Sequence, residues 1–175
     1  MGEKSLFISV VVPTCDRREP LMKCIESIRG NNYSNYEIVV VDQSSDDATQ
    51  KQMKAMFNNN QKIIYLRSDI KCSSDSRNRG WQKAKGDIIA FTDDDALVGE
   101  RWLESYAEAF DQGNTCVGMV GGRIEPIFQI PRPVWLPSEK DYLLPSFDAG
   151  KEISITVISA MGITAIKGFR ITNMD

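Results

Sequence analysis

The sequence predicts an α/β fold, an open and mostly parallel sheet with helices on both faces. Short β-branched runs recur along the first half of the chain, at positions 7–12, 37–41, 62–66 and 88–92. These runs are almost continuously apolar, which is typical of strands that are covered on both faces. Helical patterns lie between them, and strand–helix alternation at this spacing implies right-handed crossovers into a parallel sheet.

The helices are predicted from apolar residues that recur three or four positions apart. The first covers 21–28, with Gly30 just past its end. Asp16, followed by Glu19, resembles a capping arrangement for this helix. The other three patterns turn apolar residues inward: 49–57 including Met56, 74–85 including Trp81 and Ala84, and 102–110.

The pattern changes near position 120. Strand-like runs at 117–120 and 123–128 lie on either side of a Gly-Gly pair, and a proline-rich stretch follows. A further strand pattern covers 153–159. We therefore divide the chain into a first region, 1–122, and a second region, 123–175.

Composition excludes several classes of function. The chain has 175 residues, a net charge of −3 and no histidine, so it builds no Ser-His-Asp triad, Cys-His dyad or zinc-protease helix. The acidic balance, with a pI near 5.1, argues against a nucleic-acid partner. The apolar runs are too short to cross a bilayer, so we expect no transmembrane segment. The four cysteines lack metal-finger spacing and are expected to be reduced thiols in the cytoplasm.

Polar residues collect where the predicted strands end, which is where parallel sheets bind ligands. They are Thr14, Asp16, Asp42, Asp93, Asp94 and Asp95. In an extended chain Asp93 and Asp95 project to one side and Asp94 to the other, so the first and third suit Mg²⁺ or Mn²⁺. A solvated turn before a helix N-terminus explains the triplet equally well, and both interpretations stay open. An EF-hand loop is rejected because Val98 stands where glycine is required. Dinucleotide and P-loop motifs are absent.

Four blocks of sequence occur in order: ISVVVPTCDRREPLMKCIESI, YEIVVVDQSSDDAT, SRNRGWQKAKGDIIAFTDDDA and GGRIEPIF…PVWLP. Together they resemble family 2 glycosyltransferases of the GT-A fold, from residue 8 to about residue 136. The resemblance implies an enzyme that moves a sugar from a nucleoside diphosphate-sugar, UDP-sugar in particular, to a hydroxyl of a saccharide or lipid-linked acceptor. It also implies an inverting reaction that depends on Mg²⁺ or Mn²⁺. On this reading, 1–122 is the donor-binding region and 123–175 begins the acceptor side.

The resemblance also assigns roles to the polar residues at the strand ends. Thr14 and Asp16 would begin the nucleotide pocket with Ser44, while Asp42 would accept a hydrogen bond from the base. Arg77 would bind the diphosphate or organise the aspartates. Asp93 would face the ribose and metal, Asp94 would join the nucleotide site, and Asp95 would ligate the metal. Each residue also has an ordinary structural explanation, such as a loop hydroxyl, a helix cap, a strand-end turn or an exposed helical arginine.

The family pattern breaks near the C-terminus. Segment 161–167 stands in place of a Gly-Asn-Met-Ala-Phe-Arg-like block, with Ile163 where the family often has asparagine, and no Glu-Asp pair follows. No general base is therefore assigned. The chain is a fragment, or a short non-catalytic nucleotide-sugar-binding module, or a part completed by another chain. A metal-dependent phosphotransferase acting through Asp93 is a further alternative. The resemblance suggests polysaccharide assembly in the cytoplasm, peripheral to the inner face of the cell membrane.

Overall fold

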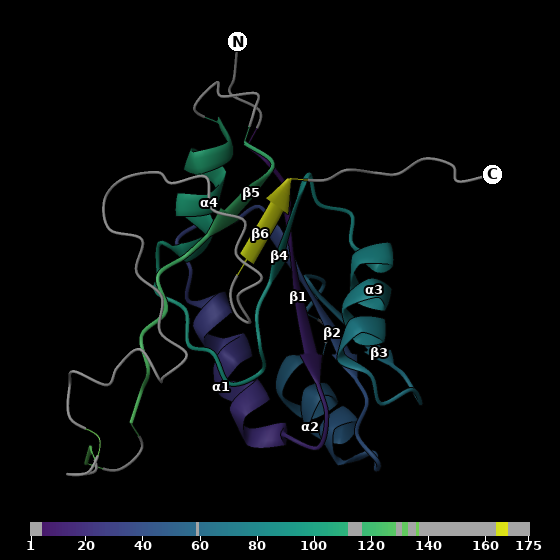
Figure 1. The fold of residues 1–175 in the computed structure, drawn as a ribbon. Helices are drawn as coiled ribbons and strands as arrows, with labels where there is room; N and C mark the ends of the chain where they lie inside the picture. The colour runs from purple at the N-terminus through teal and green to yellow at the C-terminus, as the bar shows by residue number, and fades with distance from the viewer. Residues whose placement is uncertain are drawn as a thin grey trace.

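The computed structural model describes residues 5–58, 60–111, 117–128, 131–132, 136 and 164–167. Its elements are, in chain order, β1 (Ile8–Thr14), α1 (Arg18–Arg29), β2 (Tyr36–Asp42), α2 (Ala48–Phe57), β3 (Ile63–Arg67), α3 (Ser73–Lys83), β4 (Ile88–Phe91), α4 (Trp102–Asp111), β5 (Met119–Gly121) and β6 (Thr164–Lys167). The strands form one sheet in the order β3-β2-β1-β4-β6-β5 (Figure 1). The first four strands are mutually parallel, and β6 lies antiparallel between β4 and β5. The predicted fold class is confirmed.

The two central strands explain why the sequence forms a sheet here. β1 pairs with β2 along its whole length, from Ile8 opposite Tyr36 to Thr14 opposite Asp42. All seven residues of β2 are buried, as a continuous apolar run predicts for a strand covered on both faces. β3 was expected to be covered in the same way, but its residues are half-buried or exposed. The difference arises because β3 is the edge strand of the described sheet.

Helices cover both faces of the sheet (Figure 1). The larger core lies on the face shared by α1, α2 and α4, and the smaller core on the face of α3 includes Val11 and Val41. Helix α3 approaches the sheet through Gly80, where an added Cβ would lie 2.3 Å from a methyl group of Val11. Trp81 does not point inward as expected, since it is 36% exposed. The helix packs through its glycine, which turns the neighbouring tryptophan outward.

Two further expectations are wrong, and a third concerns residues outside the described part of the chain. Met56 is 43% exposed, because α2 packs inward through Met53 and Phe57 instead. The run 123–128 is not a strand and contributes only an isolated bridge at Ile124. The strand pattern expected at 153–159 falls outside the described residues.

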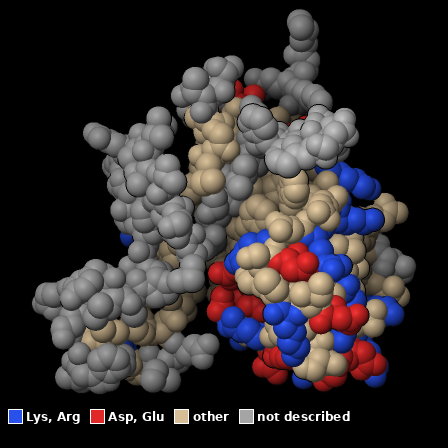
Figure 2. Space-filling model, turned by 45° about the vertical axis from the view of Figure 1, so that its right-hand side comes forward, with Lys and Arg blue, Asp and Glu red and all other residues tan. Residues whose placement is uncertain are grey.

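The parallel strands all end at the same edge of the sheet. β1 runs downward in Figure 1, so the carboxyl ends of β1 to β4 lie at the lower end of the sheet. Figure 2 shows basic and acidic side chains interspersed over the lower part of the molecule, without a patch of one sign on the face in view. No helix in the described part of the chain is long and apolar enough to span a membrane.

Candidate functional site

The centre of the carboxyl-end edge is a buried hydrogen bond between two adjacent strand ends. Thr14 ends β1, and Asp94 lies just beyond the end of β4. The Thr14 hydroxyl donates to Asp94 Oδ2 at 2.7 Å. Asp94 Oδ1 lies 3.0 Å from a guanidinium nitrogen of Arg17, which precedes α1. The Asp94 side chain is only 5% exposed, so these two contacts compensate a charge that water barely reaches.

The flanking aspartates are more exposed, and each contacts an arginine. Asp95 Oδ2 lies 2.6 Å from the second terminal nitrogen of Arg17, and Asp93 Oδ1 lies 2.8 Å from Arg77. Asp93 is 41% exposed and Asp95 is 52% exposed. The first and third carboxylates are open to solvent, as expected, but the extended backbone expected for the triplet is wrong, because Asp94 and Asp95 lie in a turn closed by a hydrogen bond from the Ala96 N–H to the Asp93 carbonyl.

Burial and charge shift the pKa values of two groups beneath this edge. Desolvation raises the pKa of Asp94, while the Thr14 hydrogen bond and the Arg17 charge act in the opposite direction. Burial also raises the pKa of the Cys24 thiol to about 12, with a smaller contribution from the three aspartates. Cys24 is therefore a neutral thiol beneath the cluster at physiological pH.

Asp42 ends β2 and is fully buried. Its Oδ1 accepts from the backbone N–H of Ser44 at 2.8 Å, and its Oδ2 accepts from the Tyr65 hydroxyl. Arg67 lies 3.9 Å from the same carboxylate. Burial, followed by this hydrogen bond to Asp42, raises the pKa of Tyr65 above its ordinary value. Both oxygens of Asp42 are thus already used by protein donors.

Asp16 does not cap α1, so that expectation is wrong. Arg17 occupies the N-cap position and α1 has no side-chain cap, while Asp16 adopts a positive φ of 55°. Its backbone N–H donates to Ser44 Oγ, and its carboxylate accepts from the Ser45 N–H at 2.8 Å and from Lys71 at 3.0 Å. The Ser45 N–H, followed by Lys71, lowers the pKa of Asp16 to about 2. Asp16 therefore joins the β1–α1 and β2–α2 loops.

The structure brings the sequence-predicted residues to one edge and adds partners that the sequence analysis missed. Those partners are Arg17, Tyr65, Arg67 and Lys71. Arg17 lies in the first quoted block and offers a signal, since a triplet of aspartates requires nearby cations. The other three belong to no motif. The three described cysteines, Cys15, Cys24 and Cys72, are free thiols as expected.

The aspartate triplet has the donor chemistry that a divalent ion requires. Carboxylate oxygens suit Mg²⁺ and Mn²⁺, and Asp93 and Asp95 present theirs to solvent. Within the described residues, no three His, Cys, Asp or Glu side chains are grouped to hold a metal. Two carboxylates therefore fit such an ion as partial ligands, and the remaining ligands must come from water or from a bound molecule.

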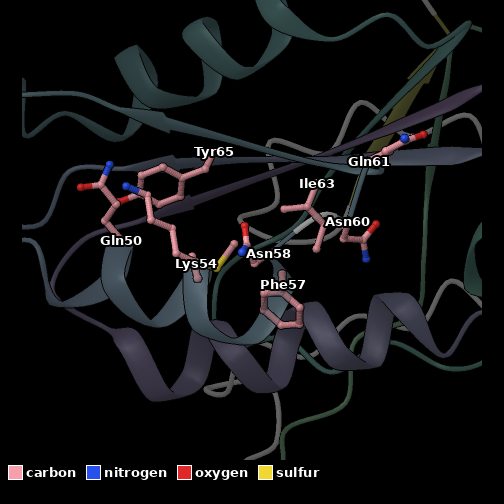
Figure 3. A pocket seen from close by; sticks show the side chains of 9 residues that line it. Gln50, Lys54, Phe57, Asn58, Asn60, Gln61, Ile63 and Tyr65 are labelled. Carbon is pink, nitrogen blue, oxygen red and sulfur yellow. The ribbon is translucent and has the colours of Figure 1, made fainter.

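A pocket of about 350 Å³ lies away from this edge, between α2 and β3 (Figure 3). Its lining is formed by Gln50, Met53, Lys54, Phe57, Asn58, Asn60, Gln61, Ile63 and Tyr65. Tyr65 links the two places, because its ring lines the pocket and its hydroxyl reaches Asp42. None of the aspartates that follow β4 lines the pocket. The carboxyl-end cluster is therefore the candidate functional site.

The chain superposes on solved glycosyltransferases of the GT-A fold. A mannosyltransferase from Pyrobaculum calidifontis, solved with GDP-Man and Mn²⁺, superposes with a TM-score of 0.63 at 20% identity, covering 94% of this chain and 45% of that one. Residues 1–349 of TarS from S. aureus, solved with UDP-GlcNAc, give a TM-score of 0.54 at 22% identity, covering 61% and 31%. These similarities establish the fold.

The sequence then defines the family. The family model described as "Glycosyl transferase family 2" matches residues 9–169, and the chain belongs to this family. A curated relative, the GalNAc(5)-diNAcBac-PP-undecaprenol beta-1,3-glucosyltransferase of Campylobacter jejuni, is 28% identical over 156 residues, covering 80% of this chain and 48% of the relative. The chain spans less than half the length of the first curated relatives it matches.

Proposed function

We propose that this chain is the donor-binding part of an inverting glycosyltransferase. It would move a sugar from a nucleoside diphosphate, UDP in particular, to a hydroxyl of a saccharide or lipid-linked acceptor. The observation that carries the proposal is the cluster after β4, where three aspartates and two arginines meet the end of β1. Such a cluster can hold a cation and the charged diphosphate together.

The residues divide between the two ends of the nucleotide. Asp16 and Ser44 lie on the two loops that would surround the nucleoside, and Thr14 ends the strand before the first of them. The contacts of Asp16 with the Ser44–Ser45 segment join the loops. Asp42 would accept a hydrogen bond from the base, which requires the Tyr65 hydroxyl to release the Asp42 oxygen to which it donates. The proposal that UDP is the nucleotide is supported by TarS, which was solved with UDP-GlcNAc.

The diphosphate end uses the arginines and the exposed carboxylates. Arg77 would bind phosphate oxygens through its guanidinium fork, since its contact with Asp93 is half-exposed and replaceable. Asp93 and Asp95 would hold Mg²⁺ or Mn²⁺, and Asp94 would support them from beneath through Thr14. When bound, the ion stabilises negative charge on the departing diphosphate. Metal use is supported by the Mn²⁺ in the Pyrobaculum mannosyltransferase.

The acceptor and the cellular location are further parts of the proposal. We propose that 1–122 binds the donor and that 123–175 begins the acceptor side. The undecaprenol-linked substrate named for the Campylobacter relative supports a lipid-linked acceptor. We further propose that the reaction takes place at the inner, cytoplasmic face of the membrane. The general base of the inverting step is not assigned to any described residue.

Calorimetric titration of the full protein with UDP, with and without Mn²⁺, tests the proposal. Because Asp93 and Asp95 make only a partial ligand set, we expect UDP to bind measurably tighter when Mn²⁺ is present. Asp95→Asn should reduce that difference by about tenfold, as loss of a charged ligand contact implies. Glu108→Gln is the matched control, since Glu108 is 53% exposed, pairs with Arg101 and lies on α4, toward the opposite end of the sheet (Figure 1).

Two results would count against the proposal. If Mn²⁺ does not change the affinity of the wild-type protein for UDP, the metal assignment is wrong. Equal losses in Asp95→Asn and Glu108→Gln would overturn the site assignment. Nucleotide binding without any transfer or donor hydrolysis by the full protein would favour a non-catalytic binding module.

A further inference from the structure

Arg17 forms ion pairs with two aspartates, one buried and one exposed to solvent. One terminal nitrogen lies 3.0 Å from Asp94 Oδ1, whose side chain is 5% exposed. The other lies 2.6 Å from Asp95 Oδ2, whose side chain is 52% exposed. The Arg17 side chain is itself 49% exposed, so its guanidinium spans the boundary between the protein interior and solvent.

The contact with Asp94 is costly to break. Removing Arg17 would leave the buried Asp94 carboxylate with the Thr14 hydroxyl as its remaining hydrogen-bond donor among the described residues. An uncompensated buried charge is strongly destabilising. The contact with Asp95 is different, because water and ions can replace an exposed partner at a cost of about 1 kcal/mol or less. Arg17 is therefore anchored through one nitrogen and exchangeable through the other.

The net charge of the cluster determines which ligands it favours. Three aspartates face two arginines, so the cluster retains one excess negative charge before any ligand binds. A diphosphate alone is repelled by that excess, and a cation alone must compete with Arg17 for Asp95. A cation and a diphosphate that arrive together satisfy both, because Asp95 gains a new partner and Arg17 becomes free to accept another.

We propose, on the basis of the proposed function, that Arg17 is an exchangeable counter-ion of this site. In the nucleotide-free protein, Arg17 forms an ion pair with Asp95. When the cation and nucleotide bind, Asp95 turns to the cation, and the freed Arg17 nitrogen binds a diphosphate oxygen while Asp94 holds the other nitrogen in place. Arg17 thereby suppresses metal binding without nucleotide and strengthens nucleotide binding with metal.

Arg77 lacks this arrangement. Its contacts are the half-exposed Asp93 and the hydroxyl of Ser73 on its own helix, so neither is a buried carboxylate. Its replacement should weaken diphosphate binding without a matching gain in free metal affinity at Asp95. The two arginines are therefore distinguishable by the sign of one measurement.

The test measures two affinities in the full protein. Free Mn²⁺ is followed by electron paramagnetic resonance without nucleotide, and UDP is titrated by calorimetry at saturating Mn²⁺. In Arg17→Gln we expect Mn²⁺ alone to bind about two- to fivefold tighter, as loss of an exposed ion pair implies. UDP should bind about tenfold weaker or worse, as loss of a charged hydrogen bond implies.

Two further variants keep the result interpretable. Arg17→Lys retains a cation beside Asp94, so it protects folding, and it should lose part of the UDP affinity because it lacks the fork. Arg79→Gln is the control, since Arg79 is 44% exposed and pairs with Asp75 on α3. Thermal unfolding of each variant shows whether it is folded.

The outcomes separate the two proposals. Absence of Mn²⁺-dependent UDP binding in the wild type would overturn the proposed function itself. Normal wild-type binding, with Mn²⁺ affinity unchanged or weaker in folded Arg17 variants, would overturn the counter-ion role. Tighter Mn²⁺ binding with unchanged UDP affinity would overturn the transfer of Arg17 to the diphosphate.

Discussion

Thr14 and Asp94 join the ends of two neighbouring parallel strands by a buried hydrogen bond of 2.7 Å. The bond fixes the loop that carries Arg17 against the turn that carries the aspartates. A neutral hydroxyl donates to a charged carboxylate, and both are largely shielded from water. The bond therefore ranks among the stronger hydrogen bonds of the described chain. Together with the ion pair of Arg17 and Asp94, it holds the cluster in place.

Replacing Thr14 with valine should destabilise the protein by about 2 kcal/mol, because Asp94 loses a donor that water cannot replace. Thr92→Val is the matched control. The Thr92 hydroxyl is also buried, but it has no hydrogen-bond partner among the described residues. Its removal should be neutral or stabilising by about 1 kcal/mol. Urea unfolding measures both, and equal effects of the two variants would contradict the prediction.

Asp16 predicts a specific dependence on pH. Its folded-state pKa, about 2, lies below the ordinary value of 3.8, so its contribution is present above pH 4 and is lost as pH falls toward 2. Asp16→Asn should therefore be less stable than the wild type at pH 6, and the difference should shrink between pH 4 and pH 2. Urea unfolding across that range tests it. A difference that stays constant down to pH 2 would show that the Asp16 charge is not involved.

Gly86 should tolerate no side chain. A Cβ there would lie 2.5 Å from the backbone nitrogen of Ser9 and 2.6 Å from the carbonyl oxygen of Ile88. Because both are sheet backbone, Gly86→Ala should cost about 2 kcal/mol or more. Gly99→Ala meets nothing within 4 Å and should change stability by less than about 0.5 kcal/mol. Thermal unfolding of the two variants provides the comparison.

The thiols should react in a fixed order. Cys72 is exposed, whereas burial raises the pKa of the half-buried Cys15, and Cys24 is buried with a pKa of about 12. In a Cys116→Ser background at pH 8, a disulfide reagent should label Cys72 first, Cys15 more slowly and Cys24 only on unfolding. Mass spectrometry identifies the labelled residue. Rapid labelling of Cys24 in the folded protein would contradict its placement beneath the aspartates.

Much of the sheet was predictable because its information is local. The continuous apolar runs of β1 and β2 can be satisfied only by burial on both faces. Features that depend on distant contacts were not predictable in this way. The approach of α3 through Gly80 reversed the expected orientation of Trp81, and the edge position of β3 left it half-buried.

In the site, too, local features were predictable from the sequence and long-range contacts were not. The aspartates were identifiable because three carboxylates after an apolar strand are unusual and costly. Their pairing was not, since Arg17 and Arg77 are 60 residues apart in sequence and nothing local states which carboxylate each one meets. Asp16 shows the limit most clearly. Its spacing resembles a helix cap, but a positive φ directs its carboxylate to Ser45 on another loop.

The late strand β6 has a consequence for biosynthesis. It lies between β4 and β5, although more than 70 residues separate it from β4 along the chain. During translation, the flank of β4 must therefore wait for residues 164–167 to leave the ribosome before it gains its antiparallel neighbour. A nascent or prematurely terminated chain would expose that flank as an open edge, which favours association with other chains.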